Sequence, residues 1–156
     1  MPAPRREIGW QEFGELCKRL AVDVHTRGLP QAVVGIARGG TIVGTTLSFM
    51  LNLEFFPIRL AKQGGSTRVI VAPTRELADR TVLLVDDLSR TGDTFKIATY
   101  ELQRVGASTI TTLALCKREP GFVPDIAALT ISAVEKVAFP WGREELVDGK
   151  FSLRKL

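Results

Sequence analysis

The chain has 156 residues and a formal net charge of +4, with 45% hydrophobic and 24% charged residues. Its length fits one domain with a sizeable core over residues 1–156, and its composition is that of an ordinary globular protein. No apolar run reaches the ~18 residues that span a bilayer, and no signal-peptide segment follows the N-terminus, so we expect a cytoplasmic protein without a membrane partner.

The positive charge is spread along the chain, without the aromatic-interleaved basic stripe that is typical of single-strand binders. An excess of this kind fits an anionic small molecule at least as well as nucleic acid, and without such a stripe we expect no nucleic-acid partner. The two cysteines, Cys17 and Cys116, have no metal-binding spacing. We expect both to be buried thiols.

The first half of the chain alternates helical and strand patterns. Apolar residues at helical spacing predict a helix over residues 10–27. A short apolar run at residues 32–37 is typical of a buried parallel strand, and a helix is expected from about residue 41 to residue 51. Residues 55–60 predict a second strand, whereas residues 61–67 have two glycines and no periodicity, which predicts a mobile loop.

The second half continues the alternation. Residues 81–85 predict a strongly buried strand, and an amphipathic helix follows the turn after it. Another strand is expected over residues 109–116, and a last strand over residues 131–139. Strands and helices in this order predict an α/β fold, with a central parallel sheet flanked by helices on both faces.

The segment at residues 82–94, V-L-L-V-D-D-L-S-R-T-G-D-T, carries the clearest chemical signal. Ligands of parallel sheets lie beyond the carboxyl ends of the strands, where Asp86 and Asp87 can hold ribose hydroxyls or a hydrated divalent metal ion. The turn that follows opens a helix, whose free N–H groups suit a phosphate, and Gly92 allows the backbone to approach it closely. The alternative to a ligand site is a strand and a capped helix in which the two acids have no function. However, an adjacent carboxylate pair at a strand end costs free energy unless a ligand uses it.

This segment resembles the signature of the type I phosphoribosyltransferases. Three further segments extend the resemblance toward the xanthine-guanine and hypoxanthine (purine) branch of that family: V-V-G-I-A-R-G-G-T, which is similar to the pyrophosphate loop, L-C-K at residues 115–117, and A-F-P-W at residues 138–141. The resemblance implies the type I phosphoribosyltransferase fold, with a small hood made by the C-terminal segment and a loop. It also implies transfer of phosphoribose from phosphoribosyl pyrophosphate to a nucleobase, in particular a 6-oxopurine, by a homodimeric enzyme that requires Mg²⁺.

The resemblance also assigns roles to residues. Asp86 and Asp87 would hold the ribose and the Mg²⁺ ion, and a basic loop that contains Lys62 would close over the site. The remaining implied contacts are Leu88, Ser89, Arg90, Thr91, Gly92, Asp93 and Thr94 around the 5-phosphate, Arg38 and Gly39 on the pyrophosphate, and Lys117, Lys136 and Val137 around the base.

Two positions depart from the branch. Arg90 stands where the branch usually has an aspartate that assists the base, and arginine cannot act as a general base. Lys136 replaces an aromatic residue that stacks on the base. Together with Lys117 they would make a cationic pocket, which favours an anionic ligand.

Two alternatives therefore stay open beside a 6-oxopurine enzyme. One is a phosphoribosyltransferase for a different, anionic base. The other is a non-catalytic or regulatory module that binds a nucleotide or phosphoribosyl pyrophosphate. A redox Rossmann enzyme is disfavoured, because no G-x-G-x-x-G follows the first strand of the alternating pattern.

Overall fold

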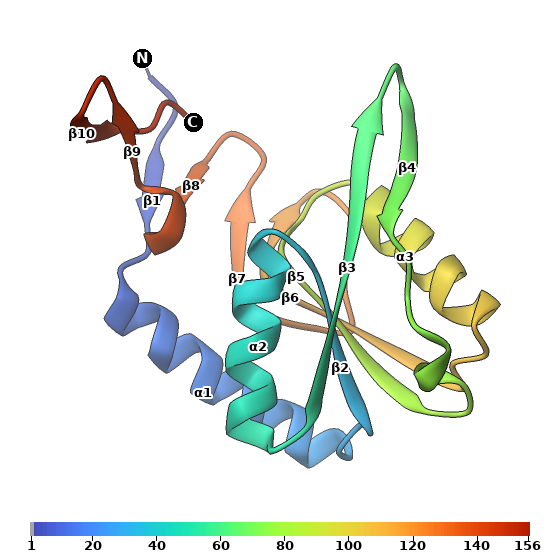
Figure 1. The fold of residues 1–156 in the computed structure, drawn as a ribbon. Helices are drawn as coiled ribbons and strands as arrows, with labels where there is room; N and C mark the ends of the chain where they lie inside the picture. Colours follow the sequence, from blue (N-terminus) through green and yellow to red (C-terminus); the bar gives the residue numbers. More distant parts are fainter. Residues whose placement is uncertain (1) are drawn as a thin grey trace.

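A computed structural model describes residues 2–156. Its core is a six-stranded sheet in the order β4-β3-β2-β5-β6-β7 (Figure 1). Neighbouring strands are parallel, except that β3 and β4 form an antiparallel pair. The α/β class with a mostly parallel central sheet is therefore confirmed. The six strands are β2 (Ala32–Ala37), β3 (Glu54–Gln63), β4 (Ser66–Val71), β5 (Thr81–Ser89), β6 (Thr109–Glu119) and β7 (Ile126–Ser132).

Helices cover both faces of the sheet. One face carries α1 (Trp10–Arg27) and α2 (Gly39–Leu51), and the other carries α3 (Asp93–Arg104). Side chains of a strand alternate between faces, so β5 contributes Leu83 to the core under α1 and α2, and Leu84 to the core under α3. This two-sided burial explains why β5 is continuously apolar before its acids. Within residues 2–156, no helix is both long and apolar enough to span a membrane.

Short strands near both chain ends form a small hood beside the sheet. Strand β1 (Arg5–Glu7) pairs in parallel with β8 (Lys136–Ala138), and β9 (Glu144–Val147) pairs with β10 (Lys150–Leu153) in an antiparallel hairpin. The 3-10 turn η2 (Pro140–Gly142) joins the two pairs, and a second such turn, η1 (Arg75–Leu77), follows β4. Figure 1 shows the hood and the β3–β4 hairpin rising on the same side of the sheet, with a gap between them.

Two sequence expectations are wrong at this level. Most of residues 61–67 are not loop, because β3 and β4 continue into them and meet at a two-residue turn. The glycines of that turn, Gly64 and Gly65, have φ values of +56° and +81°, the left-handed geometry of a tight hairpin. The last strand expected over residues 131–139 is instead the end of β7, a turn and the separate strand β8.

Candidate functional site

The acid pair lies within the last four residues of β5, because this strand continues past the expected residues 81–85 to Ser89. The backbone N–H of Asp87 donates a hydrogen bond to Oδ1 of Asp86 at 2.9 Å. Burial raises the pKa of Asp86 well above its ordinary value, and the negative charge of Asp87 raises it further. Burial also raises the pKa of Asp87, although hydrogen bonds to its carboxylate and the charge of Arg90 oppose the change. Two such carboxylates form a site that a cation would stabilise.

The turn after the acids leads directly into α3. Gly92 stands immediately before the helix with φ +85° and ψ 3°, a conformation that favours glycine. The N–H of Asp93 donates to Oγ1 of Thr91 at 3.3 Å. The first turn of a helix leaves N–H groups without partners inside the helix, and the helix dipole is positive there. The start of α3 is therefore suited to a phosphate group.

Phe122, in the loop between β6 and β7, holds this turn in place, although no sequence pattern indicates this role. Its N–H donates to the carbonyl of Arg90 at 2.8 Å, and its carbonyl accepts from the hydroxyl of Ser89 at 3.2 Å. Its ring stacks on Phe95 of α3 with centroids 5.5 Å apart. A Cβ at Gly92 would lie 2.4 Å from Cγ of this ring, so the turn and the loop fit only with glycine there.

A second wall of the site comes from the start of α2. Gly39 lies against the acid pair so closely that a Cβ on it would be 1.8 Å from Oδ2 of Asp87. Gly40 is similarly confined, because its Cβ would be 2.5 Å from the carbonyl oxygen of Val85. The peptide bond before Arg38 is cis, and the Arg38 side chain makes no ion pair with any residue in the part of the chain described. The α2 start thus offers free N–H groups and an available guanidinium beside the carboxylates.

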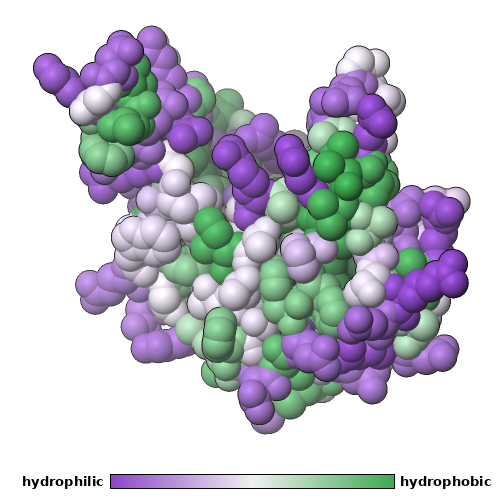
Figure 2. All heavy atoms as spheres, in the orientation of Figure 1, coloured by the Kyte–Doolittle hydropathy of each residue, from purple (hydrophilic) through white to green (hydrophobic). Residues whose placement is uncertain are grey.

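These walls enclose connected hollows, and Figure 2 shows the surface drawn in between the hood and the β3–β4 hairpin. The largest has a volume of about 560 Å³ and brings together most of the predicted site residues. An adjoining hollow of about 220 Å³ contains Arg38 and Gly39. Lys62 of β3 lines both, as does each of the two acids. The larger hollow is lined by Lys62, Asp86, Asp87, Leu88, Ser89, Arg90, Thr91, Gly92, Asp93, Thr94, Phe95, Val137 and Phe139.

Two predicted base contacts, Lys117 and Lys136, lie outside the lining of these hollows. The ammonium group of Lys117 is 3.0 Å from Oε1 of Glu119, so the expected uncompensated cation has an acidic partner. The ammonium group of Lys136 donates to the carbonyl oxygen of Leu156 at 2.6 Å. Of the three expected cations, only Arg90 faces the larger hollow.

The acid pair itself is the candidate metal centre. Within residues 2–156, no group of three or more His, Cys, Asp or Glu side chains is placed to hold a metal ion. A metal ion here would be held by Asp86 and Asp87 together with water and ligand oxygens. Mg²⁺ commonly binds in this way, through one or two carboxylates plus substrate phosphates. The residues present therefore fit Mg²⁺.

Comparison with known proteins gives one consistent result. A family model described as the phosphoribosyl transferase domain matches residues 9–144. An adenine phosphoribosyltransferase of Prochlorococcus marinus is 31% identical over 82% of this chain and 75% of its own length. Another, from Methylibium petroleiphilum, is 34% identical over 55% of this chain, a match that spans half of that protein. A purine phosphoribosyltransferase structure from Pyrococcus horikoshii has 25% identity and a TM-score of 0.82, and covers 92% of this chain and 98% of that one.

Proposed function

Because the chain belongs to the phosphoribosyl transferase domain family, we propose that it transfers phosphoribose from phosphoribosyl pyrophosphate to a purine base and releases pyrophosphate. One observation carries this proposal. Two carboxylates at the end of β5 adjoin both the glycine turn before α3 and the glycine start of α2. A sugar carrying a phosphate on one side and a pyrophosphate on the other fits this arrangement of one acidic and two anion-binding elements.

Each element has a role in this reaction. Asp86 and Asp87 hold the ribose hydroxyls and Mg²⁺, and the ion, when bound, neutralises charge that builds up on the leaving pyrophosphate. The turn around Gly92 binds the 5-phosphate, and Arg38 with the N–H groups at Gly39 binds the pyrophosphate. Displacement at the anomeric carbon by a base nitrogen needs charge stabilisation and exclusion of water. Lys62 supplies positive charge from the β3–β4 hairpin above the hollow.

The base is proposed to be a 6-oxopurine that lies against Val137 and Phe139, which line the larger hollow on the hood side. Adenine is the second candidate, for two reasons. The Prochlorococcus and Methylibium relatives are named adenine phosphoribosyltransferases. The Lys117–Glu119 ion pair also weakens the case for Lys117 as the group that binds a carbonyl oxygen.

Arg90 is proposed to contact the ligand as a cation, because this exposed guanidinium lines the hollow and offers only donors. It cannot accept the proton of the base. The reaction would then rely on positioning and electrostatics at this point, and the proton of the attacking base would pass to the released pyrophosphate or to water.

The test is an assay of pyrophosphate release from phosphoribosyl pyrophosphate and Mg²⁺ with adenine, hypoxanthine, guanine, xanthine and orotate in turn. Release with a purine, and its loss in Asp87→Asn, is the expected result. Release only with orotate would show a transferase for a different, anionic base. No release with any base, together with tight binding of a nucleotide, would show a binding module. The homodimer stays a prediction, which light scattering of the purified protein tests.

A further inference from the structure

A separate hollow lies on the α3 side of the sheet, between α3, strand β6 and the segment before β7. Its volume is about 480 Å³, within the range of about 300–1,000 Å³ that is typical of small-molecule sites. None of the residues assigned to the phosphoribosyl site lines it. Phe95 lines both this hollow and the largest one, so the two are neighbours that share one aromatic ring.

Aromatic rings form the wall of this hollow. Phe122 and Phe95 stack with centroids 5.5 Å apart and an angle of 24° between their planes. Tyr100 and Val123 also line the hollow, and they are 60% and 64% exposed. Stacked rings with apolar side chains that are open to solvent offer a face on which a planar ring can pack.

The charge that the hollow offers to a ligand is positive. Lys96 of α3 lines it, is exposed, and forms no ion pair with any residue from 2 to 156. Asp125 lines it too, but its Oδ2 accepts hydrogen bonds from the N–H of Thr112 at 2.8 Å and from the Thr112 hydroxyl at 3.0 Å. These bonds hold the carboxylate against β6 and stabilise its charge. The hollow therefore suits a ring that carries an anionic group.

Phe122 connects this hollow to the turn before α3. Its N–H donates to the carbonyl of Arg90 at 2.8 Å, and its ring lies so close to Gly92 that a Cβ there would be 2.4 Å from the ring. A ligand that packs on Phe122 from the hollow restrains the ring in the position that holds the turn. Such a ligand binds best when the turn is ordered, so it and a phosphate at the turn must strengthen each other's binding.

We propose that this hollow binds a planar aromatic anion, and that its occupancy strengthens the binding of a phosphate at the turn before α3. The ring packs on Phe122 and Tyr100, and the anionic group pairs with Lys96. The site is separate from the hollows assigned to the transfer reaction. Only the coupling rests on the proposed function, through the 5-phosphate that is assigned to the turn around Gly92.

The first experiment measures binding of 2-naphthoate, a planar ring with one carboxylate, by calorimetry. Lys96→Gln is expected to weaken this binding by about 10-fold, because a charge-assisted contact is lost. Tyr100→Ala is expected to weaken it by about 2- to 10-fold. The neutral amide 2-naphthamide, which keeps the ring, should bind equally to wild type and Lys96→Gln.

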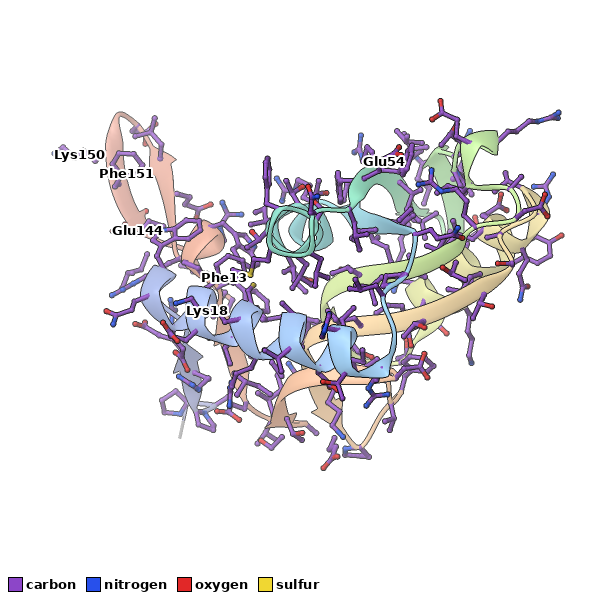
Figure 3. All side chains as sticks on the ribbon, turned by 90° about the horizontal axis from the view of Figure 1, so that it is seen from below. Phe13, Lys18, Glu54, Glu144, Lys150 and Phe151 are labelled. Atoms are coloured by element: carbon purple, nitrogen blue, oxygen red, sulfur yellow. The ribbon has the colours of Figure 1, made fainter. Side chains whose placement is uncertain are left out.

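Lys18→Gln is the matched control. Lys18 is also an exposed lysine of a helix, but it lines none of the hollows described, and Figure 3 shows it on α1, the helix that covers the other face of the sheet. Its replacement should leave the affinity for 2-naphthoate unchanged.

The second experiment measures the affinity for ribose 5-phosphate with and without saturating 2-naphthoate. The affinity is expected to rise by about fivefold or more in wild type. The same concentration of 2-naphthoate should have no such effect in Lys96→Gln.

Three results would overturn the proposal. Equal affinity of wild type and Lys96→Gln for 2-naphthoate would remove Lys96 from the site. Weaker binding of ribose 5-phosphate in the presence of 2-naphthoate would show that the probe occupies the largest hollow instead. An unchanged affinity for ribose 5-phosphate would show that the hollow and the turn are not coupled.

Thermal denaturation of each variant separates a misfolded protein from a lost contact. If Lys96→Gln is unstable, the comparison of 2-naphthoate with 2-naphthamide on wild type tests the charge without a variant. Tighter ribose 5-phosphate binding with 2-naphthoate, but no pyrophosphate release with any base, would refute the proposed transfer and support this site. Pyrophosphate release without any effect of 2-naphthoate would refute this site alone.

Discussion

The contact between Gly39 and Asp87 gives the sharpest prediction. In Gly39→Ala the new Cβ would be 1.8 Å from Oδ2 and 2.4 Å from Cγ of Asp87, whereas real Cβ contacts essentially never fall below 3.0 Å. The carboxylate must therefore move by about 1.2 Å, or the start of α2 must move away from β5. A displacement of about 1 Å at a reacting centre costs about 10²-fold in rate, and overpacking typically costs about 1–3 kcal/mol of unfolding free energy.

Pyrophosphate release measures the first effect, and thermal denaturation measures the second. Calorimetry of phosphoribosyl pyrophosphate, with and without Mg²⁺, measures whether the displaced acids still support Mg²⁺-dependent binding. We expect Gly39→Ala to lose most of its Mg²⁺-dependent affinity. Gly14→Ala is the control, since Gly14 lies inside α1 with no atom within 4 Å of a Cβ placed there. It should raise the unfolding free energy by about 0.5–1 kcal/mol and leave binding unchanged. Wild-type affinity in Gly39→Ala would show that the acids do not hold the metal and sugar from this position.

Two further predictions concern β5 and the turn after it. Folding raises the pKa of Asp86, so its stabilising contribution is present below the unfolded value of about 3.9 and is lost as pH rises through the folded value. Asp86→Asn should therefore raise the unfolding free energy near pH 7 without metal, and it should remove the part of the pH dependence of that free energy that comes from Asp86. Urea denaturation across pH measures both effects. The same variant should abolish Mg²⁺-dependent binding. Gly92→Ala should lower both the phosphate affinity and the free energy of unfolding, because its Cβ would lie 2.4 Å from Cγ of the Phe122 ring. The double variant Gly92→Ala/Phe122→Ala should recover part of the free energy of unfolding. It should not recover the phosphate affinity, because the ring that packs against the turn is then absent.

The central part of the fold could be predicted because its signals are local. The apolar run before Asp86 is long enough to identify a strand buried on both faces, and the glycine turn after it identifies the start of a helix. The stripe that predicts α1 matches the helix bounds Trp10–Arg27. The acids and the turn are contiguous in sequence, so no long-range contact was needed to bring them together.

The hood and its contacts could not be predicted in this way. Strands β1 and β8 have three residues each, too few to show a period, and they pair across more than 100 positions of the chain. Phe122 stands in a segment with two nearby prolines, where no pattern distinguishes a ring that packs on Gly92 from an exposed one. Arg154 stands in the mixed run F-S-L-R-K-L, which has no period, and only the hairpin geometry brings it to a hollow. Most of the residues that surround Arg154 are distant in the sequence, so only tertiary packing determines them.

The finding that Lys62 stands on a hairpin has a thermodynamic consequence for ligand binding. A disordered loop that closes over a ligand loses backbone entropy at that moment, about 1–2 kcal/mol for each residue ordered. Here Lys62 pairs with Thr67 in the ladder between β3 and β4, so its backbone is ordered before any ligand arrives. The register shift between Arg59 and Leu60 marks where this ladder departs from regular pairing, which bends and twists the hairpin locally. A ligand that contacts Lys62 therefore does not have to order its backbone, and less of the binding energy is spent on entropy.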